Sequence, residues 1–221
     1  MNDSNLNMED KFIRARELFG DENFAKFRRA SVLVCGCGGV GGACIEALAR
    51  TGIGRIVALD YDVFEASNQN RQILSERVGE KKSSVFAEYF ESVEGLDLRL
   101  SEESVGAFDF SGFDVVIDAI DDIPAKVALA KAVSEKLISS MGAARRLDPT
   151  QIRSESVWKT SGDPFARKFR AALKEAGFEG DFTAVYSSEP LYCATLGSFM
   201  GVTAAFGLAL ASLAVRKIAQ I

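Results

Sequence analysis

Histidine is absent from the 221 residues of the chain, and no two cysteines form a C-x-x-C pair. The first absence excludes a histidine general base, a histidine nucleophile and every metal site that needs imidazole. The second leaves a cysteine zinc site without its usual paired ligands. Acid–base and metal chemistry would therefore have to rest on other side chains.

The few cysteines, the polar N-terminus and the negative net charge bear on where the protein is located and on what it can bind. The four cysteines show no regular spacing, which argues against a disulfide framework and for a cytoplasmic location. The N-terminal run MNDSNLNMEDK is polar and acidic, so no signal peptide is expected. Because the net charge is −5 and the pI about 5.0, any contact with nucleic acid must come from a local basic patch.

The stretch from Ala30 to Asp62 organises the rest of the chain. A short uncharged run at 31–35 predicts a buried strand, 43–51 a helix and 55–59 a second buried strand. Asp60 follows that second strand, and four glycines open the turn before the helix: Gly36, Gly38, Gly39 and Gly41. Strand, glycine-rich turn, helix, strand and acid make up the phosphate-binding βαβ unit, in which N–H groups at the helix start face the phosphate.

The glycine pattern with Asp60 would also fit a nicotinamide or flavin dinucleotide, so the residues that follow decide between ligands. Asp62 adds a second acid, Asn68 and Arg71 stand three residues apart, and Lys82 and Asp121 come later. An arginine, a lysine and an acid that converge on a glycine-rich loop suit a triphosphate and its magnesium better than a hydride carrier. We therefore predict ATP and Mg²⁺ as cofactors.

Purely structural roles remain open for some of these side chains. Asn68 could cap a helix or turn, and Arg71 could pair with Asp62 or Glu65. Their occurrence together with the glycine loop favours the functional interpretation.

A second acidic group, DAIDD, follows a predicted strand at 113–117. Asp122 could be the N-cap of a helix at 125–135, but it also stands where ligands of open α/β sheets bind. We assign the contact with magnesium or nucleotide first to Asp121 and leave Asp118 in a supporting role.

Two sets of motifs carry a resemblance. GCGGVG, the run from LDYD to NxNRQ, GxxK and DAIDD resemble the adenylating ThiF/MoeB/HesA family of ubiquitin-activating enzymes and bacterial sulfur-carrier adenylyltransferases. RARELFG, SSMGAARRLDPTQIR, KTSGDPFARKFRAAL and VYSSEP resemble the branch of that family that dehydrates threonylcarbamoyladenosine in tRNA. The resemblance runs from about Phe12 to the C-terminus.

The resemblance implies a reaction and its partners. A tRNA is the implied substrate: its threonyl carboxylate, beside the anticodon, would be adenylated, and ring closure by the ureido nitrogen would expel AMP with net loss of water. The implied assembly is a homodimer, in which Arg14 of one subunit would reach the nucleotide site of the other. A sulfur-relay protein is a further partner that the family allows.

The resemblance also implies roles for particular residues. Asp60 would hold the ribose, Asn68 would orient the nucleotide, and Asp121 would hold magnesium. The catalytic set would be Arg14, Arg71, Lys82 and Asp121. The nucleotide-binding set would be Gly36, Gly38, Gly39, Gly41, Asp60, Asp62, Asn68, Arg71, Lys82, Asp121 and Asp122.

The segment from about 143 to 180 has a local excess of positive charge in an otherwise acidic protein. Its cations are Arg145, Arg146, Arg153, Lys159, Arg167, Lys168, Arg170 and Lys174. An amphipathic helix at 164–176 with Phe165 and Phe169 facing inward explains part of this pattern but not its one-sided charge. We predict a basic flap that contacts the tRNA phosphate backbone.

The apolar stretch at 194–218 is close to membrane-spanning length. Its many glycines and alanines favour instead a buried helix packed against the sheet or a dimer partner, so no membrane contact is expected. Just before it, Cys193 could act as a nucleophile, but with no histidine to activate it we favour a structural role. Cys35, Cys37 and Cys44 are expected to be small buried side chains.

These patterns predict one α/β domain over 1–221, with a Rossmann-like, doubly wound, mostly parallel sheet. The remaining predicted helices lie at 10–20, 22–29 and 80–92, and the remaining strands at 96–100, 137–141 and 182–186. Three rival functions stay open: a sulfur-carrier adenylyltransferase, an NAD-linked oxidoreductase and a nucleotide-binding scaffold without activity. Missing zinc ligands and the basic segment count against the first, and the cations and acids beyond the glycine loop against the other two.

Overall fold

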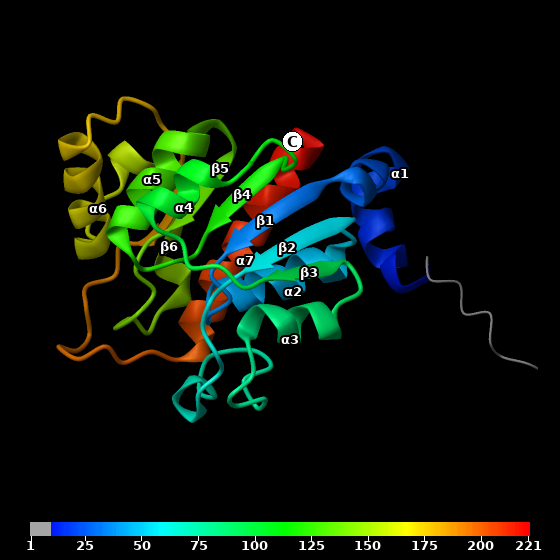
Figure 1. Cartoon of the computed structure of the whole chain (residues 1–221), viewed down its shortest axis with the longest axis horizontal. Coiled ribbons are helices and arrows are strands. Elements are labelled where there is room, and N and C mark those ends of the chain that lie inside the picture. The colour runs from blue at the N-terminus through cyan, green and yellow to red at the C-terminus, as the bar shows by residue number, and fades with distance from the viewer. Residues whose placement is uncertain (1–9) are drawn as a thin grey trace, which may run out of the picture.

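A seven-stranded sheet in the order β3-β2-β1-β4-β5-β7-β6 forms the centre of the computed structural model, which describes residues 10–221 (Figure 1). The strands are β1 (Ser31–Cys35), β2 (Arg55–Leu59), β3 (Val93–Leu96), β4 (Val115–Asp118), β5 (Leu137–Ser140), β6 (Ile152–Ser156) and β7 (Thr183–Ser187). All neighbours run parallel except β6, which pairs antiparallel with β7 at one edge. The predicted α/β fold with a mostly parallel sheet is confirmed.

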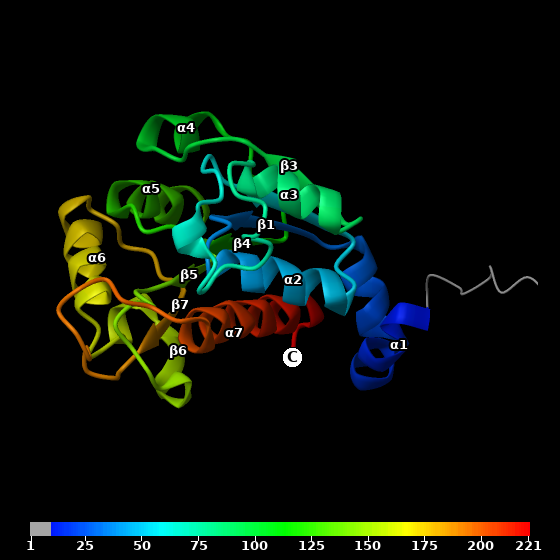
Figure 2. The same cartoon turned by 90° about the horizontal axis from the view of Figure 1, so that it is seen from below.

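Helices cover both faces of this sheet, as Figure 2 shows. They are α1 (Ile13–Arg29), α2 (Gly41–Thr51), α3 (Lys82–Tyr89), α4 (Glu102–Ala107), α5 (Ile123–Val133), α6 (Pro164–Glu175) and α7 (Met200–Ala219). Successive residues of β1 divide between two buried clusters, since side chains along a strand alternate between faces. Val32 and Val34 join the cluster that contains α2, α3 and α7, and Leu33 and Cys35 join that of α4, α5 and α6.

The C-terminal helix α7 lies directly on α2. A Cβ placed on Gly207 would lie 2.3 Å from the Val40 carbonyl oxygen and 2.8 Å from the Ala43 Cβ, so only glycine permits this approach. α7 is also the single helix within residues 10–221 that is long and apolar enough to span a membrane. Half of its apolar window is buried inside the protein, which is the usual state of a core helix.

The structure moves several predicted boundaries. The helices predicted at 10–20 and 22–29 keep their break at Gly20, where φ is +78°, within the element α1. α7 begins at Met200 and not at 194, and α3 spans only Lys82–Tyr89 within the predicted 80–92. The third strand lies at Val93–Leu96 and begins three residues before the predicted 96–100, because Val93 of β3 pairs opposite Ile56 of β2.

Two elements were not predicted, α4 and the edge strand β6. β6 has the sequence IRSES, and its middle three residues are exposed, so it lacks the apolar run that marks the central strands. The segment 143–180, predicted as a basic flap, contributes this strand to the sheet and α6 to the face that α5 covers. It is therefore anchored to the main core.

Candidate active site

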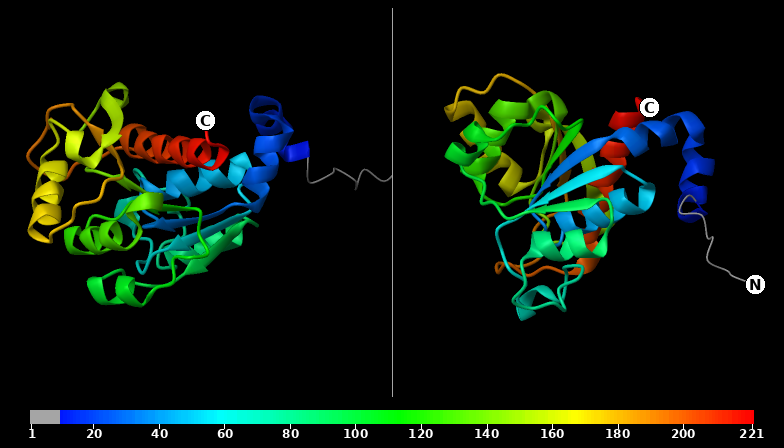
Figure 3. Two further views of the ribbon diagram at one scale, coloured as in Figure 1. Left: turned by 90° about the horizontal axis from the view of Figure 1, so that it is seen from above. Right: turned by 45° about the vertical axis from the view of Figure 1, so that its right-hand side comes forward.

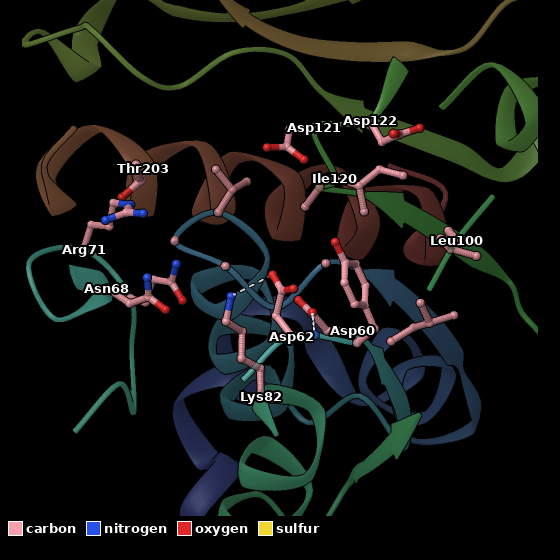
Figure 4. Close-up of a pocket in the computed structure, with 18 of the residues that line it drawn as sticks. Asp60, Asp62, Asn68, Arg71, Lys82, Leu100, Ile120, Asp121, Asp122 and Thr203 are labelled. Carbon is pink, nitrogen blue, oxygen red and sulfur yellow. Dashed lines mark hydrogen bonds and ion pairs between the residues drawn. The ribbon is translucent and has the colours of Figure 1, made fainter. Parts of the chain in front are cut away.

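A cavity of about 830 Å³ opens at the carboxyl ends of β1, β2 and β4 (Figure 4). The strand order reverses between β1 and β4, and open parallel sheets bind ligands at such a point. Its walls come from the glycine loop, the segments after β2 and β4, the turn around 66–72 and the start of α7. Ten of the predicted site residues line it: Gly36, Gly38, Gly39, Asp60, Asp62, Asn68, Arg71, Lys82, Asp121 and Asp122.

The glycine loop needs its glycines for different reasons. Gly36 has φ of +93°, and a Cβ there would lie 2.8 Å from the Ala119 carbonyl oxygen. A Cβ on Gly41, the first residue of α2, would lie 1.7 Å from the Gly36 carbonyl oxygen. These two glycines shape the turn. At Gly38 the nearest atom to such a Cβ is 3.8 Å away, so its backbone is open to a ligand in the cavity.

Asp60 ties the end of β2 to the glycine loop. One carboxylate oxygen accepts a hydrogen bond from the backbone N–H of Cys37 at 2.6 Å, and the other from that of Asp62 at 2.8 Å. The side chain is 8% exposed and lines the cavity. Because a carboxylate oxygen accepts more than one hydrogen bond, these contacts leave capacity for a ligand hydroxyl.

Lys82 carries a positive charge on the cavity wall. It is the first residue of α3, its side chain is 8% exposed, and its Nζ lies 3.2 Å from Oδ2 of Asp62 (Figure 4). The Asp62 side chain is 48% exposed, so solvent or a ligand can reach the pair. An incoming phosphate could therefore meet an ammonium group that is already held in place.

Asn68 and Arg71 lie three residues apart in the turn after β2. Oδ1 of Asn68 accepts from the Glu65 backbone N–H at 3.1 Å, so this buried residue closes a short 3₁₀ turn while it lines the cavity. Arg71 donates to the Ser67 carbonyl oxygen and to Oδ1 of Asn70, both at 2.9 Å. It pairs with neither Asp62 nor Glu65, and no carboxylate among residues 10–221 neutralises it.

The three acids at and just after the end of β4 occupy different environments. Asp118 is fully buried and accepts from Ser139 and Lys126. Asp122 is the N-cap of α5, through the Ala125 backbone N–H at 2.9 Å. The Asp121 carboxylate, in contrast, makes no hydrogen bond or ion pair within the described part of the chain and lies at the cavity (Figure 4). It is the acid most available to a ligand.

No group of three potential metal ligands occurs among residues 10–221. A magnesium ion at Asp121 would therefore need further ligands from the phosphate oxygens of a bound nucleotide. That requirement fits the oxygen-rich coordination that magnesium adopts with substrate phosphates.

Arg14 lies apart from the cavity of its own subunit. It is on α1, which leads into the amino end of β1 (Figures 2 and 3). The cavity lies at the carboxyl ends of the strands. Its side chain is 92% exposed and lies 3.5 Å from Glu17. Within one subunit, Arg14 therefore does not reach the cavity.

Sequence reasoning missed one wall of the cavity. Tyr61, Leu98, Arg99, Leu100 and Ile120 line it, and the Arg99 guanidinium lies 5.1 Å from the centre of the Tyr61 ring. The misplacement of the third strand hid Leu98 and Arg99, since they belong to an irregular segment after β3. Thr203 of α7 also lines the cavity, and no short-range pattern could have indicated that contact.

The interpretation of Arg146 as an exposed phosphate contact is wrong. This residue is 2% exposed, and its Nη2 lies 2.9 Å from Oδ2 of Asp163, the N-cap of α6. It also donates to the carbonyl oxygens of Gly142 and Glu189. Its guanidinium group thus joins three segments of the chain and is not available to a phosphate.

Cysteines 35, 37 and 44 are fully buried, as expected. Burial raises the pKa of all three thiols, and for Cys37 the nearby Asp60 carboxylate raises the pKa further. They therefore remain neutral at physiological pH. Cys193 is partly exposed, its Sγ 3.3 Å from the Thr195 carbonyl oxygen, and it does not line the cavity.

The arrangement of loop, cations and acids agrees with a comparison against protein families. The model of the ThiF family matches residues 12–220. The chain belongs to the ThiF family. The resemblance that its motifs carry is thereby confirmed.

Within the ThiF family, the chain is similar to tRNA threonylcarbamoyladenosine dehydratases over most of its length. The tRNA threonylcarbamoyladenosine dehydratase of Bacillus subtilis is 36% identical over 193 residues, which is 82% of this chain and 76% of the relative. The E. coli tRNA N6-threonylcarbamoyladenosine dehydratase TcdA, solved in complex with AMP, superposes with a TM-score of 0.90 at 35% identity. The match covers 95% of this chain and 94% of TcdA, and TcdA has also been solved with ATP.

ThiF relatives of another activity match a smaller part. The sulfur carrier protein adenylyltransferase of Thermus thermophilus is 34% identical over 115 residues, which is 48% of this chain and 42% of that relative. The similarity to dehydratases thus extends over a larger share of the chain than the similarity to this adenylyltransferase.

Proposed function

We propose that the protein is an ATP-dependent tRNA threonylcarbamoyladenosine dehydratase that works through adenylation of a carboxylate. The observation that carries this proposal is the extent of the similarity: relatives with that name match about four-fifths of the chain at 36% identity. The cavity supplies the physical counterpart, since it combines an open glycine loop with the cations Arg71, Lys82 and Arg99 and with the unpaired acid Asp121.

The contacts of the cavity residues support a nucleotide as the ligand independently of the relatives. The open backbone at Gly38 and the start of α2 offer N–H groups to phosphate oxygens. Arg71 and Lys82 add positive charge, and Arg71 has no carboxylate partner that a phosphate would have to displace. Asp60 lines the cavity and would accept a hydrogen bond from a ribose hydroxyl, and Asn68 holds the turn that carries Arg71.

The proposed reaction has two steps. The threonyl carboxylate attacks the α-phosphorus of ATP, pyrophosphate leaves, and an acyl adenylate forms on the tRNA. The ureido nitrogen then attacks the acyl carbon, loses its proton and expels AMP, so the modified nucleoside loses one water. The protein positions the reactants and stabilises negative charge, and it forms no covalent bond itself.

Asp121 is the residue proposed to hold magnesium, and the ion would supply positive charge that offsets the charge on the leaving pyrophosphate. The free carboxylate of Asp121 supports this assignment, and Asp118 and Asp122 are engaged elsewhere. In this proposal Asp122 contributes mainly by starting α5 at the edge of the cavity.

A homodimer is proposed to complete the site. Arg14 is exposed at the end of the sheet opposite its own cavity, and it can serve the reaction only from another subunit. Ile13 and Leu18 on the same helix are 52% and 76% exposed, which also suits burial against a partner.

The tRNA is proposed to contact the exposed cations of the segment 143–180. Those cations are Arg153, Lys159, Arg167, Lys168 and Lys174. The cytoplasm is the proposed location, in keeping with four free cysteines. A sulfur-relay protein remains a further proposed partner, with no residue assigned to that contact.

One experiment tests the proposed function directly. The purified protein is incubated with ATP, Mg²⁺ and tRNA that contains threonylcarbamoyladenosine, and AMP release and the mass of the digested nucleoside are measured. We expect one AMP for each nucleoside that loses a water. Adenylation of a sulfur-carrier C-terminus, with no change in the tRNA, would assign the protein to the rival activity.

A further inference from the structure

An ammonium group is fully buried beneath the turn that carries Asp121. It belongs to Lys126 on α5, and its Nζ lies 2.8 Å from Oδ2 of Asp118, with both side chains 0% exposed. The same Nζ donates to the carbonyl oxygen of Ser140 at 2.9 Å and to that of Ile120 at 3.2 Å. All three hydrogens of the ammonium group can therefore be used.

Asp118 completes the contacts around Ile120. Its Oδ1 accepts from the Ile120 backbone N–H at 3.3 Å, while its Oδ2 accepts from the Ser139 hydroxyl at 2.6 Å. Lys126 and Asp118 together thus hold Ile120 by both its N–H and its C=O. The next residue is Asp121, whose own side chain makes no hydrogen bond or ion pair within residues 10–221.

Two aromatic rings of α6 cover the ion pair. The Lys126 Nζ lies 5.7 Å from the centre of the Phe165 ring and 5.4 Å from that of Phe169. Cation–π attraction offsets part of the cost of removing the ammonium group from water. A buried pair of this kind nevertheless adds little net stability compared with apolar side chains of the same volume, so stability alone does not account for it.

We propose that Lys126 is a positioning residue for Asp121. By fixing the carbonyl of Ile120, it sets the direction in which the following carboxylate enters the cavity. The inference deepens the proposed function, because it assigns the rigidity of the Asp121 turn to a residue that touches neither nucleotide nor tRNA. Displacement of a catalytic group by about 1 Å costs on the order of 10²-fold in rate.

The test uses two variants and one matched control. Lys126→Met removes the ammonium group, and the double variant Asp118→Asn with Lys126→Met removes both charges, so that no unpaired charge stays buried. The control is Lys136→Met, because Lys136 also donates to two backbone carbonyls, those of Phe110 and Phe113, at the far end of β4. Melting temperature, kcat and KM for ATP are measured for each.

We expect the double variant to regain most of the melting temperature that Lys126→Met loses, while kcat in both stays about 10²-fold below wild type. KM for ATP should change by less than about threefold, since the glycine loop is untouched. The control should lose stability and keep kcat. A double variant with wild-type kcat would overturn the proposal.

Hydrogen exchange gives a readout that does not depend on activity. Faster amide exchange in the turn 119–122 of Lys126→Met, with no change there in Lys136→Met, is the expected result. Unchanged exchange in that turn would refute the positioning role even if the enzyme had another substrate. Failure of the proposed function itself would be seen separately, as a wild-type protein that leaves threonylcarbamoyladenosine unmodified.

Discussion

At the scale of single residues, the charged side chains of the cavity fall into two groups, those with a partner in the protein and those without one. Asp60, Asp118 and Asp122 accept hydrogen bonds that hold the backbone, and Lys82 is paired with Asp62. Arg71 and Asp121 have no partner of opposite charge in the described structure. A charged ligand could therefore pair with either side chain without displacing an existing ion pair.

Replacement of Asp121 tests this distinction. Asp121→Ala should lower kcat by about 10²-fold or more, because it removes a group aimed at charge that develops in the transition state. The melting temperature should not fall, since this carboxylate supports no other group. Steady-state kinetics and thermal unfolding are the measurements.

Asp122→Asn is the comparison, because asparagine is as good an N-cap as aspartate and keeps the start of α5. It should retain most of the activity. If Asp121→Ala stayed active while Asp122→Asn did not, the roles of the two neighbouring acids would have to be exchanged.

At the scale of elements, the junction of the glycine loop and α2 leaves the least room for change. Gly41→Ala would force a Cβ to within 1.7 Å of the Gly36 carbonyl oxygen, so loop and helix would have to separate. We expect a loss of about 1–3 kcal/mol in unfolding free energy, together with weaker ATP binding. Urea unfolding and calorimetric titration would measure the two effects.

Gly112→Ala is the matched substitution, since nothing lies within 4 Å of a Cβ at that position and its φ is not positive. Its unfolding free energy should stay unchanged or rise by several tenths of a kcal/mol. Equal losses in both variants would mean that the clash at Gly41 relaxes without consequence.

The helix α6 allows the tRNA proposal to be tested without disturbing the core. Arg167, Lys168 and Lys174 are exposed, whereas Arg170 is half-buried and donates to Thr160. Replacing the three exposed cations by glutamine should weaken tRNA binding and flatten its salt dependence by up to about 0.9 units of slope for each lost phosphate contact. Binding of ATP should not change.

The control replaces three arginines outside α6 by glutamine: Arg50, Arg55 and Arg77, each of which is paired with a glutamate. It changes the net charge of the protein equally. Identical salt slopes for wild type and the α6 variant would show that the cations of α6 only face solvent.

The elements that sequence predicts well are those with local causes. The βαβ unit follows from an uncharged run, four glycines and an acid, all within about thirty residues, and the strand limits at 31–35 and 55–59 are right. The segment after β3 and the edge strand β6 were missed because their conformation depends on pairing with distant strands. Arg146 was misread for a related reason, since its partner Asp163 approaches only in the folded chain.

At the scale of the whole molecule, the proposed site needs two copies of the chain. Arg14→Ala and Arg71→Ala should each be inactive alone, because each dimer then lacks one residue in both of its sites. Mixed dimers hold one complete site of two, so an equal mixture should recover about a quarter of wild-type activity. Exchange of subunits would be verified by mass spectrometry before the activity measurement. Confirmed mixed dimers without activity would remove Arg14 from the site.

The close packing of α7 on α2 also bears on how the protein is made. α2 begins at the last glycine of the loop and is synthesised early, but the helix that packs on it is translated only after β2 to β7 have been synthesised. Until then the residues that α2 contributes to this buried cluster, among them Cys44 and Leu48, lack the part of the cluster that α7 supplies. The nascent chain therefore exposes apolar surface of α2 beside an incomplete nucleotide site. Chaperones that bind apolar surface have the longest time to bind the chain at α2.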